Sequence, residues 1–155
     1  AQADAGRSTA EITEERVAVH PEWEKEIRMY FSQWIKMMGE QIPGMQELVE
    51  ELKDRGYGLY GLTNWSAETF PLVKDNYPVF RLLDGIVVSG EEKIAKPDPG
   101  IFSILLQRYG LKPEECLFID DNPKNVSTGE SLGIRGLVFT SAAALRSRLA
   151  EVLPE

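Results

Sequence analysis

Hydrophobic positions in the first forty residues recur every three or four residues, which predicts helices. Ser8-Thr9-Ala10-Glu11 is a capping-box pattern, so the first helix should begin near Thr9 and end before Pro21. A second helix should start at Pro21 and carry a mainly aromatic stripe, formed by Trp23, Ile27, Tyr30, Phe31, Trp34, Ile35 and Met38. We expect this stripe to pack against the chain rather than to cover a substrate. Gln41-Ile42-Pro43-Gly44 interrupts the pattern and predicts a linker.

After Gly44 the pattern alternates between helix and strand. Amphipathic segments predict helices over 45–55, 99–109 and 123–132, and another after Ser141. Short apolar runs predict strands over 57–62, 85–89, 116–120 and 134–139. Strands that alternate with helices favour parallel pairing through right-handed crossovers, so the fold class is α/β with a Rossmann-like parallel sheet and flanking helices.

One strand runs directly into two adjacent carboxylates, Asp120 and Asp121. The run before them lacks alternation, as in a strand buried on both faces of a parallel sheet. Asn122 and Pro123 suit the start of the following helix. Adjacent carboxylates repel each other, and a lysine or a divalent cation relieves that repulsion; oxygen ligands suit Mg²⁺. Taken alone, the pair could equally be an acidic pair on a solvated turn.

Two further loops carry polar groups beyond strand ends. Thr63 and Asn64 offer a hydroxyl, an amide and nearby backbone N–H groups, which can hold phosphate oxygens. Lys96 stands before a stiff Pro-Asp-Pro turn. Alone, the first would be read as a helix cap and the second as a surface lysine. Strand ends of an open α/β sheet share one edge, so donors, a cation and an acid pair should converge there on a phosphate site.

Composition narrows the function. A chain of 155 residues suffices for one domain with a sizeable core, and 43% of its residues are hydrophobic. The net charge of −8 disfavours a nucleic-acid partner. A single cysteine, Cys116, excludes an intrachain disulfide, and a single histidine, His20, makes a zinc site or a Ser-His-Asp triad hard to build. No signal peptide or transmembrane run is visible, so we expect a cytoplasmic protein without a membrane partner.

Three segments together resemble motifs two, three and four of the haloacid dehalogenase (HAD) superfamily: Leu62-Thr63-Asn64, Lys96-Pro97-Asp98-Pro99 and Phe118-Ile119-Asp120-Asp121. The resemblance covers residues 44–140. It implies that residues 43–155 form a HAD-like α/β core and that residues 1–42 form part of a helical cap.

The resemblance also implies roles for the residues that bind substrate. Thr63 and Asn64 would bind the transferred phosphoryl group, and Lys96 would neutralise charge on the nucleophile and on the phosphoryl oxygens. Trp65 and Ser66 would contact the substrate.

For the metal, the resemblance implies Mg²⁺ with Asp121 as its direct ligand. Asp120 would hold Lys96 or a metal-bound water. Asn125 falls where many family members carry a further acid, which makes it a weaker, more remote candidate. The acid pair favours the phosphatase branch over the metal-free dehalogenases.

One family feature is missing from the printed sequence. Family members attack with an aspartate of an Asp-x-Asp pattern that ends the first strand, but before residue 44 the only aspartate is Asp4. We therefore expect that the chain begins inside the cap and that the missing strand would lie between the 57–62 and 116–120 strands. We also expect the 155 residues alone to be inactive.

The function implied by the resemblance is Mg²⁺-dependent hydrolysis of a small phosphorylated metabolite, such as a sugar phosphate, through an aspartyl-phosphate. Two alternatives stay open: a metal-independent haloacid dehalogenase, and a non-catalytic interaction module of the same fold. Chelation of metal would distinguish the dehalogenase from the Mg²⁺-dependent phosphohydrolase, because only the dehalogenase activity would survive it.

Overall fold

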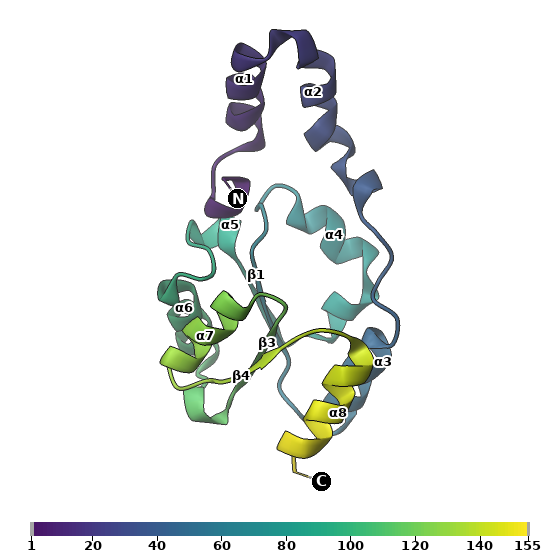
Figure 1. Ribbon diagram of the computed structural model, residues 1–155, viewed down its shortest axis with the longest axis vertical. Coiled ribbons are helices and arrows are strands. Elements are labelled where there is room, and N and C mark those ends of the chain that lie inside the picture. Colours follow the sequence, from purple (N-terminus) through teal and green to yellow (C-terminus); the bar gives the residue numbers. More distant parts are fainter. Residues whose placement is uncertain (1, 155) are drawn as a thin grey trace.

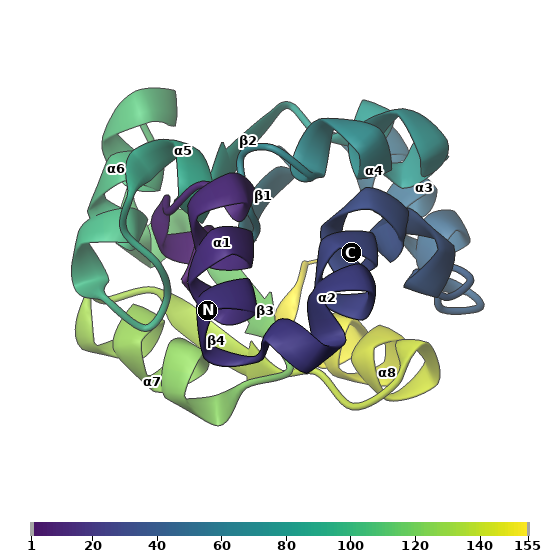
Figure 2. The same cartoon turned by 90° about the horizontal axis from the view of Figure 1, so that it is seen from above.

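The computed structural model describes residues 2–154. Two helices, α1 and α2, stand at one end of the molecule, and the α/β body lies below them (Figure 1). Viewed from above, α1 and α2 lie over the centre of the body, with the other helices arranged around its strands (Figure 2). The helical end comprises η1 (Ala3–Ala5), α1 (Thr9–Val19), η2 (Pro21–Trp23), α2 (Glu24–Gln33) and η3 (Trp34–Met37), where η denotes a 3-10 helix.

The body alternates between helices and strands, as the sequence pattern predicts. Its helices are α3 (Met45–Asp54), α4 (Phe70–Asn76), η4 (Pro78–Leu82), α5 (Ser89–Glu92), α6 (Pro99–Tyr109), η5 (Pro113–Glu115), α7 (Pro123–Ser131) and α8 (Ala142–Val152). Its strands are β1 (Tyr60–Thr63), β2 (Gly85–Val88), β3 (Leu117–Asp120) and β4 (Arg135–Val138). Within residues 2–154, no helix is both long and apolar enough to cross a bilayer.

The strands pair in two parallel ladders. β1 pairs with β2, with Thr63 opposite Val88, and β3 pairs with β4, with Asp120 opposite Val138. The predicted parallel pairing is confirmed. In the described part of the chain, β1 and β3 share no backbone ladder, so each has one edge without a strand partner.

Two hydrophobic clusters cover the body, and β3 contributes to both. Phe118 packs against the cluster built on Val87, Ile101, Phe102, Leu105 and Ile134. Leu117 and Ile119 pack against the other cluster, built on Leu48, Leu145 and Leu149. β3 is therefore covered on both faces, as predicted. However, its apolar side chains are only half-buried, since no strand pairs with its second edge; Asp120 is the buried residue of this strand.

Four helices within residues 2–154 begin with side-chain caps, among them the predicted caps Ser8 and Asn122. The side chains of Ser8, Asp98, Asn122 and Ser141 each accept a hydrogen bond from a backbone N–H in the first turn of the helix that follows. Each such cap stabilises a helix by about 1 kcal/mol. The cap is a short-range contact, which explains why sequence alone locates it.

The predicted second helix is not continuous. It divides into η2, α2 and η3, because the backbone leaves the α conformation at Trp23 and again at Gln33. The aromatic stripe is also less packed than expected: the side chains of Trp23 and Tyr30 are each 57% exposed. These two rings therefore face open space rather than a core.

The helical end contacts the body at several points. The backbone N–H and the hydroxyl of Thr9, at the start of α1, both donate to the carboxylate of Glu68. The Tyr77 hydroxyl donates to the Gly39 carbonyl at 2.7 Å. The Trp34 ring in η3 meets the Trp65 ring of the body edge-on, with 5.6 Å between the two ring centroids. The division of the chain at residue 42 stays a prediction.

Candidate active site

Lys96 joins the ends of the two ladders. Its Nζ donates to the carbonyl of Leu62 in β1 and to Oδ2 of Asp120 in β3, both at 2.6 Å. The two charged side chains are only 9% and 7% exposed. The Phe118 ring centroid lies 5.5 Å from Nζ, a favourable position for a cation. The predicted convergence of the strand-end loops at one edge is therefore confirmed.

The carboxylate of Asp120 is held by several donors. Its Oδ1 accepts from the backbone N–H of Asn122 and from Nδ2 of Asn125, both at 2.9 Å. Burial raises the pKa of Asp120, but the hydrogen bonds from Lys96, Asn122 and Asn125 together lower it further, to below its usual value. Asp120 is thus a fixed anion next to a fixed cation. The weaker sequence candidate, Asn125, lies within this network.

Asn64 clamps the backbone of Lys96. Its Oδ1 accepts from the Lys96 N–H and its Nδ2 donates to the Lys96 carbonyl, both at 2.8 Å. The amide therefore positions the lysine, a role that the sequence does not indicate. Its predicted contact with a phosphoryl group stays a prediction. Thr63, the last residue of β1, makes no side-chain hydrogen bond within residues 2–154, so its hydroxyl is available to a ligand.

The loop after β1 is tied to the residues that follow β2. The backbone N–H of Trp65 donates to Oγ of Ser89 at 2.9 Å, and Gly90 N–H donates to the Trp65 carbonyl at 2.9 Å. A Cβ on Gly90 would lie 2.4 Å from the backbone nitrogen of Ala67, so only glycine fits there. Sequence reasoning missed Ser89 and Gly90, although two small residues directly after a strand are a usable signal of close backbone approach.

Ser66 lies beside this contact and is 4% exposed. Its Oγ accepts from the backbone N–H of Glu68 at 3.2 Å, an interaction local to the loop. Neither Asn64 nor Ser66 caps α4, which begins at Phe70 without a side-chain cap. The helix-cap reading of Asn64 is therefore wrong, because its amide bonds to the Lys96 backbone instead.

The oxygen atoms at and near Asp121 could form part of the ligand set of a Mg²⁺ ion. Asp121 is exposed, and within residues 2–154 its carboxylate makes no hydrogen bond or ion pair. Oδ1 of Asn125 is a buried acceptor without a partner there. No group of three His, Cys, Asp or Glu residues in the described chain is arranged for a metal. Mg²⁺ usually binds one or two carboxylates and completes its shell with water and substrate phosphate, so the set is compatible with it.

Comparisons with known proteins address the family of the chain. The sequence profile of the haloacid dehalogenase-like hydrolases matches residues 3–133. A sesquiterpene phosphatase from Aspergillus oryzae is 30% identical over 109 residues, which is 70% of this chain and 56% of the relative. A flavin mononucleotide hydrolase from Arabidopsis thaliana is 29% identical over 111 residues, 72% of this chain and 45% of the relative. The chain thus spans about half the length of these curated relatives.

Among solved structures, a HAD family enzyme from Bacteroides thetaiotaomicron, crystallised with magnesium and inorganic phosphate, superposes with a TM-score of 0.75. The alignment covers 90% of this chain and 73% of that chain, at 24% identity. Likeness at this identity concerns the fold, in which parallel strands are flanked by helices.

Proposed function

The chain belongs to the haloacid dehalogenase-like hydrolase family, and from this premise we propose that the protein is a Mg²⁺-dependent phosphohydrolase of a small phosphorylated metabolite. The observation that carries the proposal is the buried Lys96–Asp120 pair where β1 and β3 end. A buried ion pair is costly to desolvate and is weak evidence for a purely structural role. A fixed ammonium at the ligand-binding edge of a parallel sheet suits a phosphoryl group.

The proposed mechanism follows from charge. An anionic nucleophile and an anionic phosphoryl group repel each other, and the Lys96 ammonium offsets that repulsion and stabilises oxygens that gain charge. The Thr63 hydroxyl orients the phosphoryl group by donating to one of its oxygens. Asn64 acts through Lys96, whose backbone it holds. Trp65 and Ser66 form the wall on the substrate side.

Asp121 would be the protein ligand of Mg²⁺, with Asp120 beside it. When bound, Mg²⁺ supplies positive charge to the phosphoryl oxygens. The family resemblance further implies attack by an aspartate, and an aspartyl-phosphate that water then hydrolyses. The printed sequence contains no Asp-x-Asp pattern, so the residues assigned above bind and activate the phosphoryl group rather than attack it.

Binding of inorganic phosphate tests the proposal on this chain. We expect phosphate to bind in the presence of Mg²⁺ and this binding to be lost when EDTA removes the metal. Isothermal titration calorimetry measures both. Asp121→Asn should weaken the Mg²⁺-dependent binding at least about tenfold, since it removes a metal ligand. Asp75→Asn, which changes an exposed aspartate on α4, is the matched control. Equal phosphate binding with and without Mg²⁺ would contradict the proposal.

Activity provides a second readout, measured on the native protein. Lys96→Ala or Asp121→Asn should lower kcat for phosphomonoesters by about 10²–10³-fold, as the loss of one preorganised electrostatic contact does. Near-normal turnover by either variant would reject the assignment. Release of halide from a haloacid that persists in EDTA would establish the dehalogenase alternative instead.

A further inference from the structure

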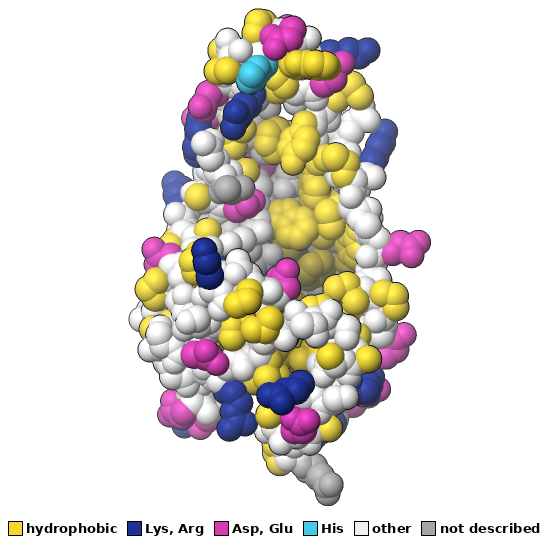
Figure 3. Space-filling model, viewed as in Figure 1, with side chains coloured by type: hydrophobic (Ala, Val, Ile, Leu, Met, Phe, Trp, Pro, Cys, Tyr) yellow, Lys and Arg dark blue, Asp and Glu magenta, His cyan; other side chains and the backbone are white. Residues whose placement is uncertain are grey.

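The loop after β1 opens onto a long apolar groove. Hydrophobic side chains line a hollow that extends from the body up to the space between α1 and α2 (Figure 3). Its lower part is a cavity of about 440 Å³ that includes the loop residues Asn64, Trp65 and Ser66. Its upper part, of about 550 Å³, lies between α1 and α2. Tyr30 and Phe31 line both parts, so the groove is continuous with the candidate active site.

The lining of the groove is dominated by large apolar side chains that solvent can reach. Trp34, Met37 and Met38 line the lower part. Trp23 and Tyr30 are 57% exposed and Met37 is 61% exposed. A contiguous exposed surface of this kind marks a binding site more often than a scattered apolar residue does.

The polar groups at the floor of the groove are already engaged. Both amide atoms of Asn64 bond to the Lys96 backbone, and Ser66 Oγ accepts from a backbone N–H. The Thr69 hydroxyl accepts from Nε1 of Trp65 at 3.2 Å. The hydroxyls of a sugar placed here would lose water and find few free partners, which opposes their binding.

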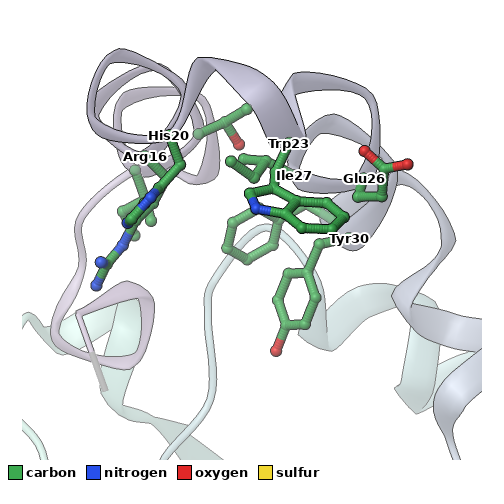
Figure 4. A pocket seen from close by; sticks show the side chains of 9 residues that line it. Arg16, His20, Trp23, Glu26, Ile27 and Tyr30 are labelled. Atoms are coloured by element: carbon green, nitrogen blue, oxygen red, sulfur yellow. The ribbon is translucent and has the colours of Figure 1, made fainter.

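Asp4 also lines the lower part, and further polar side chains lie at the upper end. Arg16 and His20 lie on the α1 side there, while Trp23 and Tyr30 lie on the α2 side (Figure 4). Within residues 2–154, the Arg16 guanidinium has no ion pair and no side-chain hydrogen bond. The groove is thus polar at its two ends and apolar between them.

Resting on the proposed function, we infer that the substrate is a phosphate monoester of a large, mainly apolar alcohol, of isoprenoid or aryl type. Its phosphate lies at the loop after β1, beside Lys96. Its alcohol part lies along the groove and packs against Tyr30, Phe31 and Trp34. This class differs from the sugar phosphate that the family branch suggests. The apolar body gains free energy by leaving water, and the largely engaged floor gives polar competitors little compensation.

All three tryptophans of the chain, Trp23, Trp34 and Trp65, line this groove. Intrinsic fluorescence therefore reports its occupancy directly. The chain is titrated, in the presence of Mg²⁺, with geranyl phosphate, 1-naphthyl phosphate, glucose 6-phosphate and inorganic phosphate. We expect at least one apolar ester to shift the emission to shorter wavelength and to bind at least about tenfold more tightly than glucose 6-phosphate. The tighter of the two apolar esters identifies the isoprenoid or the aryl class.

A variant pair locates the preference. Tyr30→Ser should lower the ratio of the affinities for the preferred apolar ester and inorganic phosphate by about tenfold, because it removes a ring from both parts of the groove. Val19→Ser changes an exposed apolar residue at the end of α1, outside the groove lining, and should leave that ratio unchanged.

Three results would overturn the inference. One is glucose 6-phosphate binding as tightly as the apolar esters. Another is geraniol binding as tightly as geranyl phosphate, which would make the groove a general apolar surface. The third is concentration-dependent dimerisation, seen by sedimentation, that blocks ester binding. If inorganic phosphate binds but the apolar esters show no preference, only this inference fails; if inorganic phosphate does not bind, the proposed function fails as well.

Discussion

At the scale of the residue, Lys96 has two tasks. It offers positive charge at the strand ends, and it is the partner that keeps a buried carboxylate from being unpaired. We expect Lys96→Ala to lower the free energy of unfolding by about 3–5 kcal/mol, the usual cost of leaving one member of a buried pair behind. Urea unfolding measures this. Lys74→Ala, at an exposed position on α4, should change the same quantity by less than about 0.5 kcal/mol. Equal stabilities of the two variants would show that Asp120 finds another partner.

The acid response of the site belongs to Asp120. Because its pKa is lower in the folded protein than in the unfolded chain, its contribution to stability is complete above the unfolded value of about 3.9 and is lost as the pH falls through the folded value. Asn125→Ala removes one donor, so the pKa of Asp120 should rise. Carboxyl ¹³C NMR titration of the unsubstituted protein and of Asn125→Ala shows which of the two has the higher Asp120 pKa. An unchanged pKa in the variant would mean that the 2.9 Å bond from Asn125 does not stabilise the carboxylate.

The candidate residues were predictable to different degrees. Asp120 could be identified because it ends a strand, and Lys96 because its loop follows one. Asn125, which lies within α7, was named only through the family resemblance. The clamp by Asn64 could not, since it depends on the approach of a loop far along the chain. The buried partner Ser89 was missed although small residues directly after a strand signal close backbone approach.

At the scale of the element, helix boundaries set by local contacts were predictable from the sequence, and boundaries set by long-range contacts were not. Caps and left-handed glycines such as Gly110 mark helix boundaries through contacts within one turn. The breaks around α2 have no comparable local marker. η3 begins at Trp34, whose ring meets Trp65 of the body, a contact that periodicity cannot reveal.

Glu68 fastens α1 to the loop that bears Trp65 and Ser66. Glu68→Ala should free the first turn of α1 and destabilise it by about 1 kcal/mol, the usual value of such a contact. Hydrogen–deuterium exchange should accelerate in residues 9–19 and stay unchanged in residues 99–109. Glu50→Ala is the control, because within residues 2–154 the Glu50 side chain bonds only to Gln46 of its own helix. Exchange that rises equally in both segments would indicate global destabilisation instead of local release.

At the scale of the whole molecule, the alternation of strands and helices was sufficient to predict the α/β fold and its parallel pairing. The groove was not predictable. Helical spacing places Tyr30 and Phe31 on one side of α2, but it does not say how far α2 stands from α1. The two helices are joined to each other by the Arg28–Glu14 ion pair and to the body by contacts such as that of Thr9 with Glu68. Their spacing determines whether a stripe of aromatic residues becomes a core or a binding surface.

The two separate ladders have a practical consequence. Each of β1 and β3 keeps one row of N–H and C=O groups without a strand partner in the described chain. Such rows act as templates for extended segments of other molecules, and natural proteins usually blunt them with charge or proline. The Lys96 ammonium lies where the two strands end, but it is already bonded to the Leu62 carbonyl and to Asp120. We therefore expect concentrated solutions of the chain to form sheet-rich aggregates more readily than dilute ones.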